Sequence, residues 1–392
     1  MVRRYPRRLN RYQSYVTNHN LAHHENNMVT MIAEQEEVVV TRDRYRVAVP
    51  EWVEDDGIAK MIGFELEKIG YEPILFFFER NIPDDIDCLL TFGPYNKILP
   101  IWQNNARVES SRRPVVIHWN TEGMPDPRIP IRVIGALGAI RSKLGRMGHS
   151  GSVFDHFLYS IRPMSSIDEL FKRYRYHGDY EYAFRKGWLH VLSDTSHIYS
   201  EVRSKIGVPT LYAPWGASQT WYEDLCLERD IDVLWMGKKG SQRRSRILDR
   251  VLRELKSKGL NVYIADDEEN PFIFGKQRTR YLNRAKITLN ITRTWYDDNF
   301  SRFTLACPNR SLVVSEPVLP HCTEFKKNVH YVSAKIEDLA DTIVYYLEHE
   351  DERRQIVDNA YELMMAELTF EKSLRKMLTA AQQYTARGAM KS

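Results

Sequence analysis

The sequence predicts an α/β protein with two Rossmann-like, doubly wound domains in tandem, facing a central cleft. Three observations lead to this fold class. Short apolar runs recur along the chain and are continuous rather than alternating, as in parallel strands buried on both faces. Segments with helical spacing of apolar residues separate these runs, which indicates repeated βαβ units. A break near residues 215–228 divides the pattern into two series, and 392 residues suffice for two such domains.

The first series is predicted to form an amino-terminal domain at residues 44–216, after an extension at residues 1–43 that lacks a clear period. Its expected strands are 45–50, 72–78, 86–92, 114–119, 188–193 and 208–213. Its expected helices are 57–69, 129–144, 167–175 and 195–206. The first of these helices ends before Gly70 and the last before Gly207, and glycine is a common helix stop signal.

The second series is predicted to form a carboxy-terminal domain at residues 217–370, followed by a helix at 371–392 that crosses back to the first domain. Its expected strands are 231–236, 260–265, 286–291, 311–314 and 330–332. Its expected helices are 243–258, 274–283, 301–307, 336–347, 351–368 and 371–386. Ligands of open α/β sheets bind at the carboxyl ends of the strands, so the cleft is the expected binding site.

Composition narrows the class of protein. The net charge is +4 and the apolar fraction is 43%, which fits a globular protein better than a general nucleic-acid binder. The basic residues are concentrated only in the amino-terminal extension, at Arg3, Arg4, Arg7, Arg8 and Arg11. This segment is either a solubilising tail or a contact for nucleic acid or an anionic surface. The four cysteines lack disulfide spacing, and no signal peptide or transmembrane run is visible, so we expect a cytoplasmic protein.

A strand, a glycine-bearing loop and a helix follow one another at residues 232–246. The loop begins at Gly237, and a helix start of this kind offers free backbone N–H groups to a phosphate. The positive charges that would meet a diphosphate are Lys238, Lys239, Arg243 and Arg244. The order of residues matches neither a P-loop nor a dinucleotide fingerprint. An ordinary turn with a solvated basic face explains the same residues, and both interpretations remain open.

A second group of polar residues lies in the stretch LNITRTWYDDNFSRFTLACPNRSLVVSE at positions 289–316. Asn290 ends one strand, Arg302 lies in the first turn of the next helix, and Glu316 follows the next strand. An arginine fork there suits a diphosphate, and a carboxylate at a strand end suits a ribose. The alternatives are an Arg302–Glu316 surface pair and an acid that ends a strand. We predict Arg302 for the diphosphate and Asn290 and Glu316 for the nucleoside.

Residues 231–376 resemble the carboxy-terminal domain of the CgeB-like glycosyltransferases, which are related to the retaining family four. The matching stretches are RDIDVLWMGKKGSQRRSRIL, LNITR, SRFTLACPNRSLVVSEP, DLADTIVYYLEHEDERRQIVDNAYE and TFEKSLRKML. The resemblance implies a GT-B fold, a nucleotide-diphosphate sugar as donor, no further cofactor and no obligatory metal. It also implies that Gly237 and Arg302 contact phosphate and Glu316 the ribose. Thr304 stands where many relatives have glutamate, and Asn309 is expected to adopt the positive φ of their glycine.

The acceptor side of the reaction has its candidates in the first series. His118, Asn120 and Glu122 lie at the end of the strand 114–119, and we expect them to face the cleft. An inverting enzyme needs a base there, and His118 and Glu122 are the candidates for catalysis. His149 and His156 are weaker ones. The acidic runs 266–269 and 296–298 could suggest a metal site, but the first lies on a loop after a strand, which is normally solvated, and no metal ligand is predicted.

Three functional hypotheses follow. The first is a hexosyltransferase-like enzyme that moves a sugar from a nucleotide diphosphate to an acceptor hydroxyl, metal-independent and retaining. Its acceptor is open among a glycan, a small molecule, a protein and modified DNA. The second is a phage-type transferase that acts on DNA, because the amino terminus is rich in arginine and basic and aromatic residues alternate at positions 171–182. The third is a non-catalytic assembly protein with the same fold, suggested by the altered segment FTLACPN.

Overall fold

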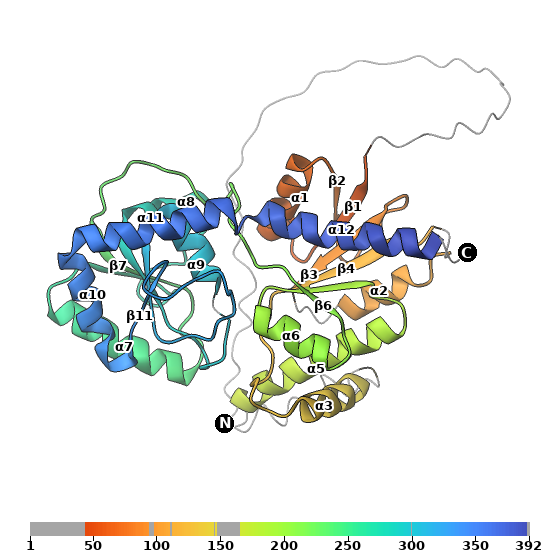
Figure 1. The fold of residues 1–392 in the computed structure, drawn as a ribbon, viewed down its shortest axis with the longest axis horizontal. Coiled ribbons are helices and arrows are strands. Elements are labelled where there is room, and N and C mark those ends of the chain that lie inside the picture. Colours follow the sequence, from red (N-terminus) through yellow and green to blue (C-terminus); the bar gives the residue numbers. More distant parts are fainter. Residues whose placement is uncertain are drawn as a thin grey trace, which may run out of the picture. The chain divides into compact units, whose positions relative to one another are not determined.

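The computed structural model of the protein describes residues 44–93, 98–109, 112–144, 146, 165–298 and 300–389, which belong to one compact unit (Figure 1). The predicted extension at 1–43 and the candidates His149 and His156 lie outside the described residues. The described chain forms two parallel sheets, each with its own helices, which confirms the predicted pair of doubly wound domains.

The first sheet has six strands in the order β2-β1-β3-β4-β5-β6, and every neighbouring pair is parallel. The strands are β1 (Arg46–Glu51), β2 (Glu72–Phe77), β3 (Cys88–Phe92), β4 (Val115–Asn120), β5 (Val191–Asp194) and β6 (Thr210–Tyr212). The helices of this half are α1 (Gly57–Lys68), α2 (Ile98–Asn105), α3 (Ile131–Leu144), α5 (Ser165–Arg185) and α6 (His197–Lys205). The sequence did not predict α2, and α5 continues ten residues beyond its predicted end at Arg175.

The second sheet has five parallel strands in the order β11-β10-β9-β7-β8. The strands are β7 (Ile231–Met236), β8 (Val262–Ala265), β9 (Ala285–Asn290), β10 (Leu312–Ser315) and β11 (Val332–Ser333). The helices are α7 (Gln242–Ser257), α8 (Gly275–Arg284), α9 (Phe300–Ala306), α10 (Leu339–Glu348) and α11 (Glu350–Ala366), with short 3₁₀ turns at Cys307–Asn309 and Ile336–Asp338. The carboxyl ends of β7, β9 and β10 therefore lie side by side at one edge, because neighbouring parallel strands end together.

The last helix, α12 (Phe370–Ala389), packs on the first sheet although it follows the second sheet in the sequence (Figure 1). Its buried residues Phe370, Leu374 and Met377 join the core formed by β1, β3 and β4. The chain passes between the sheets at two places, and these two segments are hydrogen-bonded to each other. Ala217 N–H donates to Leu368 O at 2.7 Å, and Phe370 N–H donates to Ala217 O at 2.9 Å.

Gly216 allows these two segments to approach. A Cβ atom at this position would lie 2.4 Å from the carbonyl carbon of Thr369 and 2.5 Å from the Leu368 oxygen. Both are backbone atoms, so no side-chain rotation relieves the overlap. We expect Gly216→Ala to lower the free energy of unfolding by about 1–3 kcal/mol, as overpacking does. Gly57→Ala is the control, since its Cβ would have nothing within 4 Å. Equal urea midpoints for the two variants would contradict this expectation.

None of the helices in the described part of the chain is both long and apolar enough to cross a membrane.

Candidate functional site

The loop after β7 begins at the carboxyl edge of the second sheet. Gly237 and Gly240 have φ angles of 108° and 71°, which only glycine adopts readily. Ser241 caps α7, because its side chain accepts a hydrogen bond from the Arg244 N–H, and its own hydroxyl donates to Arg293 O at 2.8 Å. This cap connects the loop after β7 to the loop after β9 and holds the start of α7 at the edge of the sheet.

Arg302 lies directly behind this loop. Its side chain is buried, with 8% of the residue exposed. Nε and Nη2 donate to Met236 O at 3.2 and 3.1 Å, and Nη1 donates to Asn290 Oδ1 at 3.2 Å. The guanidinium lies over the Trp235 ring, 4.1 Å from its centroid. Its hydrogen-bond partners are all neutral, so they orient the cation without cancelling its charge.

The charge of Arg302 has no neutralising partner in the part of the chain that the structure describes. Among the residues that the structure describes, no carboxylate forms an ion pair with it. Burial lowers the pKa of Arg302, and the positive charges of Arg244 and Arg293 lower it further. A guanidinium stays protonated at neutral pH, so the lowered pKa reports first the cost of burying this charge and then its repulsion by Arg244 and Arg293. An anion bound at this edge would relieve that repulsion.

Asn290 contributes to the site by holding Arg302. Its side chain is fully buried, accepts from Arg302 through Oδ1 and donates through Nδ2 to Ser315 Oγ at 3.0 Å. The predicted neighbourhood of Asn290 and Arg302 is therefore present. Both the oxygen and the nitrogen of the Asn290 amide are hydrogen-bonded within the protein, so Asn290 acts as a positioning residue for Arg302.

The carboxylate of Glu316, predicted to bind the ribose, is already engaged by other residues of the protein. It is 2% exposed, and Oε1 accepts from Thr292 N at 2.6 Å and from Thr292 Oγ1 at 2.8 Å. Arg243 donates to both carboxylate oxygens. Glu316 therefore does form a pair with an arginine, but the partner is Arg243 and not Arg302. The carboxylate is buried, whereas the Arg243 side chain is 33% exposed. Glu316 and Arg243, predicted for ribose and diphosphate, hold each other and fix the loop after β9.

The remaining basic residues of the loop differ in their hydrogen bonds, ion pairs and exposure to solvent. Arg244 is buried and donates to the carbonyl oxygens of Lys238 and Lys239, so it supports the backbone of the loop. Lys239 Nζ lies 2.9 Å from Glu268 and 3.3 Å from Asp249. Lys238 is exposed, with its Nζ 5.9 Å from the centroid of the Phe272 ring. Lys238 is therefore the most accessible cation of the predicted phosphate-binding set.

A pocket of about 100 Å³ opens next to Asn290. Aromatic side chains and the segment after β10 form most of its wall. The lining residues are Asn290, Asp298, Phe303, Val318, Leu319, Pro320, His321, Cys322, Phe325 and Tyr331. It lies beside the side chains that hold Arg302, since Asn290 contributes to both.

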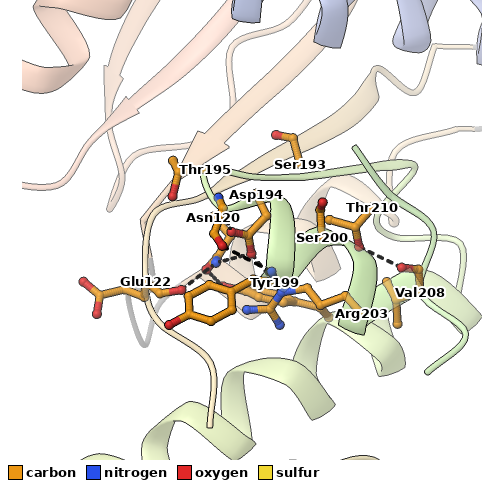
Figure 2. A network of polar contacts seen from close by, with 12 residues as sticks. Asn120, Glu122, Ser193, Asp194, Thr195, Tyr199, Ser200, Arg203, Val208 and Thr210 are labelled. Carbon is orange, nitrogen blue, oxygen red and sulfur yellow. Dashed lines mark hydrogen bonds and ion pairs between the residues drawn. The ribbon is translucent and has the colours of Figure 1, made fainter. Parts of the chain in front are cut away.

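In the first sheet, a buried polar network occupies the carboxyl ends of β4 and β5 (Figure 2). Asn120 donates to Asp194 Oδ2 at 2.8 Å and accepts from the Tyr180 hydroxyl at 2.8 Å. Arg203 Nε donates to the same Asp194 oxygen at 3.0 Å. Asp194 and Arg203 are 0% and 1% exposed, so they form an ion pair inside the protein.

The prediction that His118 faces the cleft is wrong. The residue is 0% exposed, with Nδ1 3.0 Å from Thr91 Oγ1 and Nε2 3.1 Å from the Tyr180 hydroxyl. Burial, and then the charge of Arg203, lower the pKa of His118 to about 3. The imidazole is a neutral part of the core and has no path to an acceptor hydroxyl. Glu122 remains on the acceptor side: it is half-buried, and Figure 2 shows its carboxylate pointing away from Asn120 and Asp194.

The buried histidines make stability depend on pH. Burial lowers the pKa of His177 to about 3 as well, and neither ring nitrogen has a partner within the described residues. The unfolded chain protonates near pH 6.5, so it binds protons that the folded chain excludes as the pH falls towards 3. We expect the free energy of unfolding to fall over this range by about 1.4 kcal/mol per pH unit for each such histidine. His177→Leu should reduce this slope in urea titrations at pH 7 and 5; an unchanged slope contradicts the assignment.

Residues of the two halves contact each other near the loop 294–298. Arg173 Nη2 donates to Asp297 Oδ1 at 2.6 Å, and both side chains are less than 10% exposed. The Tyr199 hydroxyl donates to Tyr296 O at 2.6 Å, and Thr195 Oγ1 to Asp298 Oδ2 at 3.2 Å. These contacts hold the chain between β9 and α9 against α5 and α6.

The stretch 171–182, proposed as a nucleic-acid surface, lies on α5. Arg173 is in the ion pair just described, and Tyr174, His177 and Tyr180 are buried. Arg175 pairs with Asp179 at 3.4 Å. From 173 to 182, where the side chains are described, the basic and aromatic residues are all buried or half-buried, so their alternation reflects packing inside the protein.

The acidic runs form no metal cluster in the structure. Among the described residues, no group of three or more His, Cys, Asp and Glu side chains is arranged to hold a metal ion. Asp266 accepts from the N–H groups of Glu268 and Glu269, and Asp297 pairs with Arg173.

The expectation for Asn309 is wrong, because the residue with a positive φ is Arg310, at 55°. Asn309 instead donates to Trp221 O and Leu305 O at 3.0 and 2.8 Å.

The sequence and the structure of the chain were compared with those of known proteins. Residues 243–379 match the model of a family described as glycosyl transferase-like. Sucrose-phosphate synthase from Thermosynechococcus elongatus is 12% identical, with a TM-score of 0.54 over 88% of this chain and 100% of that one. Anabaena Alr3699/HepE in complex with UDP is 9% identical, with a TM-score of 0.52 and the same coverage. No curated protein matches the sequence. The chain has the GT-B fold and carries a glycosyltransferase-like segment in its second half.

Proposed function

We propose that the protein is a glycosyltransferase that moves a sugar from a nucleotide-diphosphate donor to an acceptor hydroxyl. The observation that carries this proposal is Arg302: a buried cation, oriented by neutral groups and without a carboxylate partner among the described residues. It lies at the carboxyl edge of a parallel sheet, where open α/β folds bind ligands. The resemblance to CgeB-like enzymes and the UDP bound by the structural neighbour HepE support the same donor class.

In this proposal the diphosphate binds between Arg302, the exposed Lys238 and the start of α7. The bond between the sugar carbon and the diphosphate oxygen breaks, and the oxygen keeps the electron pair. The acceptor oxygen forms the new bond to the same carbon, and the proton of its hydroxyl passes to the leaving diphosphate. Cations and a helix amino terminus stabilise the negative charge that develops. These groups can neutralise the leaving diphosphate themselves, and we therefore propose transfer without an obligatory metal or further cofactor.

We further propose that the sugar is transferred with retention of configuration. An inverting enzyme needs a base for the acceptor hydroxyl. His118 does not fill that role, because it is buried and its pKa is lowered to about 3. Glu122 is the other candidate base, and we assign it to contact with the acceptor because the resemblance to CgeB-like enzymes, which are related to a retaining family, favours retention. The DNA-modifying alternative loses the support of residues 171–182, and nothing in the described structure favours it over other acceptors.

A thermal-shift panel of UDP-, GDP-, TDP- and ADP-sugars tests the proposal. A donor at 100 times its Kd stabilises the folded protein by about 2.7 kcal/mol, which raises the melting temperature by several degrees. We expect at least one member of the panel to produce such a shift. A panel without any shift would contradict the transferase and would favour an assembly protein that has kept only the fold.

A further inference from the structure

The outward face of α3 carries a row of exposed apolar side chains. Val133, Ile140 and Leu144 are 44%, 55% and 38% exposed. They follow one another at intervals of seven and four residues, which are close to two turns and one turn of an α-helix, so they lie in one line along it. Ala136 is exposed between the first two. Scattered apolar residues are ordinary on a protein surface, whereas an aligned row indicates a contact with something apolar.

The opposite face of α3 holds the helix on the protein. Its buried residues are Ile134, Gly138 and Ser142, each four positions after the last. Gly138 lies against the backbone of α5, since a Cβ atom there would be 3.0 Å from Tyr174 O and 3.2 Å from Gly178 N. Figure 1 shows α3 on the outside of the first half, beside α5. The apolar row therefore points away from the protein.

Basic side chains flank this row on both sides. α3 contains Arg132, Arg141 and Lys143 and neither aspartate nor glutamate. Successive residues of a helix are rotated by about 100°, which places Arg132 and Lys143 on one side of the row and Arg141 on the other. Arg132 and Lys143 are exposed, and no carboxylate in the described part of the chain pairs with either.

The acidic residues of the adjoining segments already have cations of their own. Asp126, before α3, pairs with Arg128 at 2.7 Å, and Asp179 of α5 pairs with Arg175 at 3.4 Å. The outward face of α3 is therefore both apolar and positively charged. It is also the convex side of a helix, so it forms a ridge and not a groove. A ridge of apolar side chains between long basic ones matches a plane of phosphate headgroups above acyl chains.

We propose that α3 binds the protein to the surface of an anionic lipid bilayer, with the helix axis in the plane of that surface. Val133, Ile140 and Leu144 enter the boundary between headgroups and acyl chains, and Arg132 and Lys143 contact headgroup phosphates. This inference does not rest on the proposed transferase activity, because none of these residues belongs to the Arg302 site.

Sedimentation with lipid vesicles tests the inference on the full chain. The vesicles consist of phosphatidylcholine alone or of phosphatidylcholine and phosphatidylglycerol in equal parts. We expect the wild type to bind the mixed vesicles, to bind phosphatidylcholine much less, and to be released by added salt. Ile140→Ser should weaken binding to the mixed vesicles about tenfold, since its side chain no longer enters the apolar layer. Arg132→Gln/Lys143→Gln should weaken it about twentyfold, at about fivefold for each charge removed.

Phe64→Ser is the matched control. Phe64 is 44% exposed on α1, another helix of the first half, where Glu65 and Glu67 follow it. Its replacement should change vesicle binding less than twofold. Failure of the wild type to bind the mixed vesicles would overturn the inference. Binding that persists in both α3 variants would also overturn it and would assign the contact to other residues, such as the arginines of the amino terminus. A wild-type dimer that Ile140→Ser converts to a monomer in light scattering would show that a second copy of the chain covers this face instead.

Discussion

Arg302→Ala is expected to lower kcat for sugar transfer, or for donor hydrolysis without acceptor, by about 10²–10³. Loss of one preorganised donor to the developing negative charge has an effect of this size. The arginine is held by Met236 O and Asn290 Oδ1, so it is oriented before the ligand arrives. Arg302→Lys should recover only part of the activity, because an ammonium group does not reproduce the planar fork.

Arg284→Ala is the control for this experiment. Arg284 also lies in the second half and pairs with Asp230, but its side chain is 31% exposed and it does not belong to the site. Its replacement should leave kcat within about twofold of the wild type. Circular dichroism must show that Arg302→Ala remains folded. A folded Arg302→Ala variant that turns over its donor at the wild-type rate would rule out the proposed diphosphate site.

Arg203→Ala is expected to cost about 3–5 kcal/mol of unfolding free energy, the effect of breaking a buried ion pair. Asp194 would be left inside the protein without its cation. Burial raises the pKa of Asp194, and the charge of Arg203 opposes that rise. Without Arg203 the carboxyl group must take up a proton or the network with Asn120 must open.

Urea denaturation measures this effect, and a surface pair on the same helix gives the control. Lys205 Nζ lies 3.4 Å from Glu201, and both side chains are more than half exposed. Lys205→Ala should change the unfolding free energy by less than about 1 kcal/mol. The double variant Asp194→Asn/Arg203→Met should be more stable than Arg203→Ala, since it leaves no buried charge. Similar midpoints for Arg203→Ala and Lys205→Ala would show that the buried pair contributes no more than a surface pair.

The fold was predictable because its signals are local. Parallel strands buried on both faces are short, continuous apolar runs, and β4 and β10 are buried at every position. The helix α2 was missed because it has only eight residues and includes Pro100. The 21-residue α5 was predicted too short, since its buried polar residues obscure the helical period.

The site was predictable only in part, because a position at a strand end does not determine a side chain's partners. Arg302 and Asn290 were placed together correctly, since they flank one loop. His118 has the same kind of sequence position as Asn290, but it points into the core. The partner of Glu316 is Arg243, 73 residues away, and sequence spacing carries no information on such a pair. Asp194 is the last residue of β5, as Asn290 is of β9, and could have been found by the same rule.

The central claim is that Arg302 marks the binding site of a nucleotide diphosphate. Calorimetric titration of UDP, GDP, TDP and ADP into the wild-type chain and into folded Arg302→Ala tests it most directly. We expect at least one of these nucleotides to bind the wild type and its Kd to rise about tenfold or more in the variant. A nucleotide diphosphate that binds both proteins with the same Kd, or the absence of binding by all four, would contradict it.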